Sequence, residues 1–265
     1  MKIYKTHFLE KESDVSIISD SKLAINYAKE SFYFHRNILE QYIKKNKRFL
    51  TSFSPLKVKT SQKIIKIMAD AAEICDVGPM AAVAGALSDL MRESMKTQKN
   101  VSKNETSQCN VALVENGGEI SVDSQKPMKI ALYAGDNELN LNLGFLIKKE
   151  DCPFGIGTSS ATVGHAISLG LADAVTIFAE NAALADAAAT KVCNMVKGRD
   201  VEKSIKKGLD VIDDINGVTG AFISREDKVG QVGKIPQLIK ITGYKYQILN
   251  KVKDLVLEGD YEIIK

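Results

Sequence analysis

The feature that most constrains this fold is the order in which helical and strand-like segments follow one another. Apolar residues at helical spacing fill most of residues 22–95, after a short strand pair within residues 3–19. Short strand-like segments then occupy residues 110–147, and a strand over 173–179 precedes an alanine-rich helix; two more strands are expected between 217 and 238. Helices and strands therefore come in runs and do not alternate, which predicts an α+β fold with an antiparallel sheet and packed helices.

Turn and cap residues mark the ends of several of these elements. Asn116, Gly117 and Gly118 separate two strand-like segments, and Asn-Gly at such a place is a strong hairpin signal. Asn181 is expected to cap the alanine-rich helix, and Gly198 is expected to lie just beyond its end. These residues indicate where the predicted elements begin and end along the chain.

Two breaks interrupt the first part of the chain, one between two predicted helices and one between the helices and the strands. Pro79 follows a break at residues 76–78 and suits the first turn of a new helix, whose small residues would let another backbone or a ligand come close. A polar connector is expected at about residues 96–108, where almost every side chain is hydrophilic. Because no internal repeat or low-complexity stretch divides the sequence, we expect residues 1–265 to form one domain.

The charge balance and the cysteines narrow the class of protein. The chain has 36 Lys and Arg against 33 Asp and Glu, which argues against a dedicated nucleic-acid binder. No apolar run follows the first lysine as in a signal peptide, and no stretch reaches the roughly 20 apolar residues of a membrane helix. The four cysteines are far apart and form no CxxC pair, so we expect a cytoplasmic protein without a membrane partner.

Asp186 and Thr190 form the candidate metal site. They lie four residues apart in the alanine-rich helix, so both side chains share one helix face. A carboxylate and a hydroxyl on a surface of alanines form an oxygen site that Mg²⁺ accepts when phosphates supply further ligands. The alternative is structural: the helix dipole favours an acid near a helix start, and threonine can bond to its own helix backbone.

The segment over residues 155–165 is rich in glycine and hydroxyl side chains and is expected to be a loop around a phosphate. The candidate ligand-binding residues in it are Thr158, Ser159, Ser160, Thr162 and Gly164. Gly117 and Gly118 would likewise let a ring or a phosphate lie against bare backbone. His165 ends the segment and is a candidate base or ligand, with a packed, hydrogen-bonded histidine as the alternative.

Four longer motifs resemble a known family. The segments VGPMAAVAGA, VENGGEI, TSSATVGHAISLGLADAV and LADAAAT occur in this order, and the resemblance extends over about residues 7–240. They closely resemble an archaeal and bacterial family of ApbE-like proteins and, more distantly, ApbE itself, the FAD:protein FMN transferase. The resemblance implies an ApbE-like, T-fold-like antiparallel sheet, with FAD and Mg²⁺ as ligands.

The resemblance also implies roles for single residues. LADAAAT is similar to the ApbE ending Ala-Asp-Ala-Leu-Ala-Thr, whose Asp and Thr hold Mg²⁺ beside the FAD pyrophosphate; the matching residues here are Asp186 and Thr190. VENGGEI is similar to the ApbE Gly-Gly-[Asp/Glu]-Ile turn, which adds Glu119 to the candidate cofactor-binding residues. His165 lies where ApbE has a His-rich motif before Asp-Pro, although AISLGLAD follows it here.

The reaction implied by the resemblance is FMN transfer to an acceptor protein or cleavage of the FAD pyrophosphate. Asp173 and His165 are the candidate catalytic bases. Thr162 is a candidate acceptor within the chain itself, because residues 156–162 match the motif that ApbE flavinylates except that Ile156 replaces its Asp. The expected partners are thus a flavin nucleotide and an acceptor protein.

A purely structural protein with a relic pocket is one alternative, and two further alternatives of other classes stay open. One is a protein that binds flavin or another nucleotide without transferring it. The other is an accessory protein in the anaerobic assimilation of sulfide into homocysteine, with a sulfur-pathway protein as partner and Cys152 as a reactive thiol. A homo-oligomer is compatible with each alternative.

Overall fold

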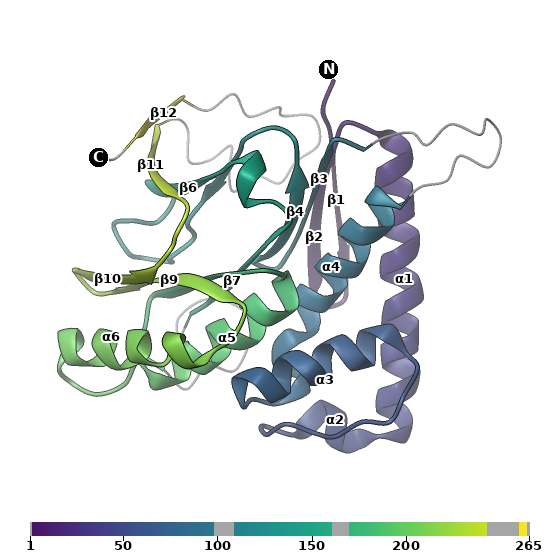
Figure 1. The fold of residues 1–265 in the computed structure, drawn as a ribbon, viewed down its shortest axis with the longest axis horizontal. Coiled ribbons are helices and arrows are strands. Elements are labelled where there is room, and N and C mark those ends of the chain that lie inside the picture. Colours follow the sequence, from purple (N-terminus) through teal and green to yellow (C-terminus); the bar gives the residue numbers. More distant parts are fainter. Residues whose placement is uncertain (1, 98–108, 161–169, 243–259, 264–265) are drawn as a thin grey trace.

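A large antiparallel sheet forms the centre of the molecule (Figure 1). The structure is a computed structural model that describes residues 2–97, 109–160, 170–242 and 260–263. Within this part, eight strands pair in the order β1-β2-β3-β4-β7-β8-β9-β10. Their bounds are β1 Tyr4–Glu10, β2 Ser13–Ser19, β3 Val111–Asn116, β4 Glu119–Ser124, β7 Phe154–Ser159, β8 Ala174–Ala179, β9 Val218–Arg225 and β10 Lys228–Gly233.

A second, smaller antiparallel sheet and a layer of helices complete the fold. The second sheet has the order β12-β11-β6-β5, with bounds β5 Met128–Ala131, β6 Leu143–Ile147, β11 Gln237–Thr242 and β12 Asp260–Ile263. The α-helices are α1 Lys22–Lys45, α2 Lys47–Thr51, α3 Lys63–Cys75, α4 Val83–Lys96, α5 Ala182–Met195 and α6 Val201–Asp210. Short 3-10 turns lie at η1 Pro79–Ala82, η2 Lys149–Asp151 and η3 Ile212–Asp214.

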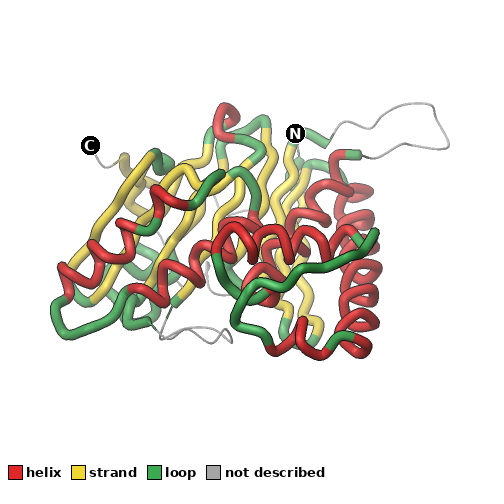
Figure 2. The backbone as a smooth tube through the Cα atoms, turned by 60° about the horizontal axis from the view of Figure 1, so that its bottom comes forward, coloured by secondary structure: helices red, strands yellow, loops and turns green. Residues whose placement is uncertain are grey.

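The helices cover one face of the large sheet, and the second sheet covers part of the other (Figures 1 and 2). Alternation along β8 shows the two layers: Val175 and Ile177 pack with the helices, whereas Ala174 and Phe178 pack toward the second sheet. Phe145 of β6 meets the Phe178 ring edge-on at a centroid distance of 4.9 Å. The α+β fold with an antiparallel sheet and packed helices is therefore confirmed.

Several local predictions are confirmed with it. Gly117 and Gly118 have φ angles of 68° and 114° and form the turn of the β3–β4 hairpin. The Asn181 side chain accepts a hydrogen bond of 2.8 Å from the Leu184 N–H and caps α5. Pro79 begins a 3-10 turn, and α4 itself starts four residues later at Val83.

One expectation about secondary structure is wrong, and one helix was not predicted. The predicted loop over residues 155–165 begins as strand β7, which extends to Ser159, and helix α6 follows α5 although the sequence reading placed none there. The glycines of β7 explain the error over residues 155–165. A Cβ on Gly155 would lie 2.0 Å from the carbonyl carbon of Asn181, and one on Gly157 would lie 2.5 Å from that of Ala185. Glycine thus lets α5 lie directly on the strand.

The predicted polar connector lies mostly outside the described residues. Residues 98–108 of the predicted polar connector lie outside the described residues, and α4 ends at Lys96 where the connector was expected to begin. In the described part of the chain no single helix is long and apolar enough to cross a membrane, although the bent pair of α3 and the Pro79–Lys96 segment satisfies length and composition together.

Candidate functional site

The candidate site lies where α4 and α5 cross above β4 and β7. Gly85 makes the crossing close, because a Cβ there would lie 2.2 Å from the Ala182 carbonyl oxygen. Each helix also supplies a carboxylate to the start of the other. Asp186 Oδ2 of α5 accepts a hydrogen bond of 3.0 Å from the Gly85 N–H near the start of α4. Asp89 of α4 binds the Ala182 and Ala183 N–H groups at 3.0 and 2.9 Å. Such carboxylates satisfy amides that lack partners within their own helix.

Asp89 is the polar centre of this crossing. Its Oδ1 also accepts a hydrogen bond of 2.6 Å from the Ser121 hydroxyl, which in turn accepts one of 2.9 Å from Arg92 Nε. Burial raises the pKa of the Asp89 carboxyl, while the hydroxyl and amide donors oppose this rise. The sequence reading missed this residue. A signal was present, because Asp89 is the single acid within the otherwise apolar and small-residue segment 84–91.

Asp186 and Glu119 form a pair of interacting carboxylates. Glu119 begins β4 on the helix-facing side, and its side chain is 8% exposed. Burial raises its pKa well above the ordinary value, and the negative charges of Asp186 and Glu115 raise it further. Burial also raises the pKa of Asp186 to about 7, against the effect of the Gly85 and Ala84 amides. In the described part of the chain, burial and repulsion between carboxylates both disfavour the charged forms, a condition that a bound cation would relieve.

The donor set of this group suits Mg²⁺. Thr190 lies one helical turn after Asp186 on α5, and both side chains are partly exposed. The carboxylate of Asp186, the Thr190 hydroxyl and the nearby Glu119 present oxygen atoms, the ligands that Mg²⁺ prefers. The described residues contain no group of three or more His, Cys, Asp or Glu side chains placed to hold a metal ion. Mg²⁺ here would therefore take its remaining ligands from water or phosphate, as it commonly does.

The structure sorts the other predicted ligand-binding residues into two sets. The Gly117–Gly118 turn adjoins β7, since a Cβ on Gly118 would lie 3.7 Å from the Thr158 carbonyl oxygen. The Thr158 N–H donates to the Glu119 carboxylate, but the Thr158 hydroxyl pairs with Thr176 at 3.2 Å on the opposite face of the sheet. The backbone of Thr158, and not its hydroxyl, thus belongs to the carboxylate group.

The remaining candidates lie farther along the chain. Ser159 shares the helix-facing side of β7 with Gly157, and Ser159 and Ser160 are both 9% exposed. Asp173 Oδ2 accepts hydrogen bonds of 2.8 Å from Asn137 Nδ2 and 2.7 Å from the Glu226 N–H, at the turn between β9 and β10. The structure thus gives Asp173 a turn-stabilising role. Thr162, Gly164 and His165 lie outside the described residues.

Comparison with known proteins places the chain in a family. The family model described as "AbpE bacteria" matches residues 2–215. The chain belongs to this ApbE-like family. It is similar to the UPF0280 protein of Methanocaldococcus jannaschii, with 42% identity over 240 residues that cover 89% of this chain and 93% of the relative. A UPF0280 protein of Methanococcus maripaludis is 40% identical over 259 residues, covering 97% of this chain and 100% of the relative.

A solved structure supports the fold of this ApbE-like chain independently. The apo form of the flavinyl transferase ApbE from Pseudomonas stutzeri matches with a TM-score of 0.52 and 15% sequence identity. The match covers 88% of this chain and 94% of the ApbE chain. At this identity the likeness shows the fold, and the expected ApbE-like arrangement is thereby confirmed.

The contribution of Asp186 to the stability of this ApbE-like protein should fall as pH rises from about 4 to about 7. The pKa of Asp186 is about 7 in the folded state and near 4 in an unfolded chain, so the folded state binds more protons within this window. We expect Asp186→Asn to flatten this part of the profile, because the variant shares every other titrating group with the wild type. Urea unfolding at pH 5, 6, 7 and 8 without divalent cations measures this. Equal slopes for the two proteins would contradict it.

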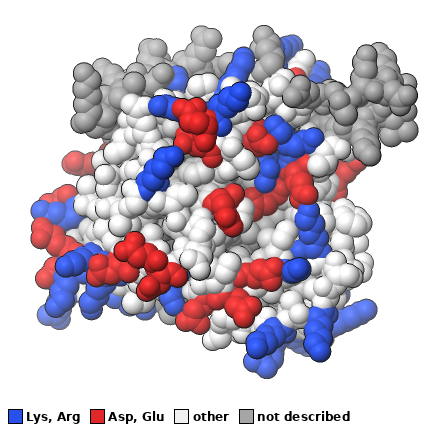
Figure 3. Space-filling view, in the orientation of Figure 1, with Lys and Arg blue, Asp and Glu red and all other residues white. Residues whose placement is uncertain are grey.

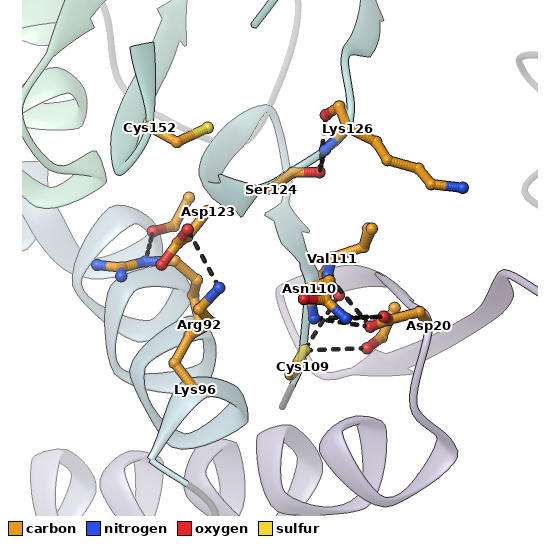
Figure 4. Close-up of polar contacts among 12 residues, drawn as sticks. Asp20, Arg92, Lys96, Cys109, Asn110, Val111, Asp123, Ser124, Lys126 and Cys152 are labelled. Atoms are coloured by element: carbon orange, nitrogen blue, oxygen red, sulfur yellow. Dashed lines mark hydrogen bonds and ion pairs between the residues drawn. The ribbon is translucent and has the colours of Figure 1, made fainter. Parts of the chain in front are cut away.

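Cys152 is the one cysteine outside the buried set in the described part of the chain. Figure 4 shows it near the end of β4, in the region where Lys96 and Asp123 form an ion pair of 3.2 Å. Partial burial raises the pKa of the Cys152 thiol, and the charges of Asp123 and Asp151 act in the same direction. A raised pKa reduces the thiolate population on which thiol reactivity depends. This environment disfavours the reactive-thiol interpretation.

Proposed function

We propose that this protein binds FAD with Mg²⁺ at the Glu119–Asp186–Thr190 group and transfers FMN from FAD to a hydroxyl of an acceptor protein. The observation that carries the proposal is the pair of mutually repelling carboxylates on an ApbE-like fold, Glu119 buried and Asp186 half-buried, with raised pKa values and oxygen donors beside them. A stable core does not require such a pair, because an amide would serve the Gly85 N–H equally well. The pair is therefore better explained by a ligand than by stability.

The chain's own residues divide the work of the transfer. Asp186 and Thr190 hold the cation, and Glu119 adds negative charge to the same group. Mg²⁺, when bound, supplies positive charge that offsets the pyrophosphate and stabilises AMP as it leaves. The acceptor hydroxyl oxygen forms a bond to the phosphorus on the FMN side, while the bond from that phosphorus to the bridging oxygen breaks. AMP leaves with that electron pair.

The hydroxyl proton passes to a base near the attacking oxygen. Of the two candidates from sequence, Asp173 is held by two donors at the β9–β10 turn. We therefore favour His165 as the base. The Gly117–Gly118 turn and the backbone of Thr158 border the carboxylate group and would position the phosphates against bare backbone.

Incubation of the purified protein with FAD and Mg²⁺ tests this function. We expect AMP in the small-molecule fraction by chromatography, together with an FMN mass on an added acceptor by intact mass spectrometry. An FMN mass on the chain itself would point to Thr162 as the acceptor. FAD that binds but stays whole would replace transfer by the flavin-binding alternative. Absence of FAD binding with and without Mg²⁺ would overturn the proposal.

A further inference from the structure

A basic groove lies along the free edge of the large sheet, away from the carboxylate group. It has a volume of about 880 Å³ and is lined by residues of β1, β2, the start of α1 and the segment that leads into β5. Among the described residues that line it there is no carboxylate, and there are six lysines: Lys2, Lys5, Lys22, Lys29, Lys126 and Lys129. On the face of the molecule in Figure 3, by contrast, blue and red residues are interspersed. The groove is thus a concentration of one charge in a nearly neutral protein.

The groove follows the first residues of β1 and the two residues before them. β1 is the first strand in the sheet order, and among the described strands it pairs with β2 alone. The consecutive residues 2–6 all line the groove, although alternate side chains of a strand point to opposite faces. The groove therefore surrounds the strand edge from both faces. An edge strand of this kind presents unpaired N–H and C=O groups to any extended chain that approaches.

The lysines flank this edge on both faces. Tyr4 lies on the helix-facing side, where the ammonium groups of Lys2 and Lys22 approach its ring centroid to 5.5 and 5.2 Å. Lys5 pairs in register with Ile18, which packs on the opposite side, toward the second sheet. Lys126 borders the groove on that side, and Figure 4 shows its side chain extending away from the labelled polar contacts.

Ion pairs between described residues do not account for four of these lysines. None of the ion pairs between described residues involves Lys2, Lys5, Lys22 or Lys126. The nearby carboxylate of Asp20 is instead bound by the amides of Asn110 and Val111. Lys22 also occupies the first position of α1, where the helix dipole disfavours a cation.

We propose that this groove binds an extended acidic segment of a partner protein, which adds to the large sheet as a strand beside β1. Main-chain hydrogen bonds to the β1 edge would give the affinity, and the lysines on both faces would select acidic side chains. Apolar residues lie on both sides of the edge, Ile25 on the helix-facing side and Ile18 and Met128 toward the second sheet, and they suit small apolar side chains between the acids. The groove runs beside residues 2–6, so the partner is an acidic, β-prone peptide whose central part, about five residues long, pairs with them.

Lysines also protect edge strands from unwanted pairing with other strands. This protective role and the proposed role in binding an acidic segment predict different results. Protection requires that no peptide binds, whereas the proposal requires specific binding of an acidic one. The inference goes beyond the proposed function and does not depend on flavin transfer. The groove lies near the open end of the β3–β4 hairpin, at Val111 and Lys126, whereas Glu119 lies at its turn.

A labelled peptide tests the proposal on the full-length protein. The probe is Glu-Glu-Val-Thr-Val-Glu-Glu-amide with a fluorophore on its N-terminus; it presents glutamates on both faces of a strand, and its binding is followed by fluorescence anisotropy at low salt. We expect saturable binding that weakens about tenfold or more in the double variant Lys5→Glu/Lys22→Glu. The matched control is Lys44→Glu/Lys47→Glu, in a second basic groove at the end of α1, and it should bind as the wild type does.

The same peptide with alternate amides N-methylated separates strand addition from simple charge attraction. It keeps every glutamate but cannot form the ladder with β1, so we expect its binding to be lost. Equal binding of the methylated peptide, or equal weakening by the control variant, would overturn the proposal. If tripolyphosphate binds with the same lysine dependence while the peptide does not, the groove is a small-anion site and the proposal is wrong.

Discussion

Asp186→Asn should bind FAD at least about 100-fold more weakly in Mg²⁺ while folding more stably than the wild type at pH 8. The loss follows because the substitution removes a proposed direct ligand of Mg²⁺, and even residues that only support a metal ligand are worth about 10–100-fold in metal affinity. The gain follows because the amide keeps an acceptor for the Gly85 N–H without a buried charge. With a carboxyl pKa of about 7, we expect the gain to be about 1–2 kcal/mol.

Isothermal titration with FAD, with and without Mg²⁺, measures the first effect, and urea unfolding at pH 8 measures the second. Asp76→Asn is the matched control. Asp76 ion-pairs with Lys191 of α5 at 3.1 Å, but its side chain is 76% exposed, and its φ of 51° is one that asparagine adopts readily. We expect the control to bind FAD normally. FAD affinity unchanged in Asp186→Asn would remove the metal assignment and leave Asp186 as a partner of α4 alone.

The opposite changes in binding and stability are what distinguish a ligand from a structural carboxylate. Glu119→Gln should show the same two opposite changes, because burial and the charge of Asp186 raise the pKa of the Glu119 carboxyl. If a carboxylate is retained for stability alone, the protein becomes less stable when the charge of that carboxylate is removed. If a carboxylate is retained for a ligand, it lowers the stability of the free protein, and ligand binding restores that stability.

The parts of the site that could be predicted from sequence depend on local geometry. The four-residue spacing of Asp186 and Thr190 places both on one helix face in any α-helix. The Asn116–Gly118 turn is likewise specified by residues that accept positive φ. Each of these features needs only a few consecutive residues, so their sequence carries the information.

The parts that could not be predicted depend on contacts between distant segments. Asp89 binds amides of Ala182 and Ala183 that lie 93 and 94 residues away, and nothing near Asp89 specifies that partner. The strand identity of β7 depends on α5 lying against Gly155 and Gly157, whereas glycines viewed alone indicate a loop. Helix α6 is different, because Asp200 caps it and Ile205 and Leu209 follow at helical spacing. Its signal was local and was overlooked.

Asp89→Ala should lower the free energy of unfolding by about 3 kcal/mol, the largest stability effect that we expect from one side chain at the site. The substitution leaves the Ala182 and Ala183 amides and the Ser121 hydroxyl without their acceptor in a buried setting. A lost helix cap costs about 1 kcal/mol, and each buried donor left unpaired costs about 1–3 kcal/mol. Release of a buried carboxylate with a raised pKa offsets part of this loss.

Asp200→Ala provides the comparison within the same protein. Asp200 caps α6 through one hydrogen bond of 3.0 Å to the Lys203 N–H at an exposed site, so we expect its loss to cost about 1 kcal/mol. Urea unfolding followed by circular dichroism at pH 7 gives both values. A cost for Asp89→Ala no larger than that for Asp200→Ala would show that the α4–α5 crossing is held by packing at Gly85 alone. A markedly larger cost would make Asp89 the polar anchor that holds α5, and with it Asp186, over β7.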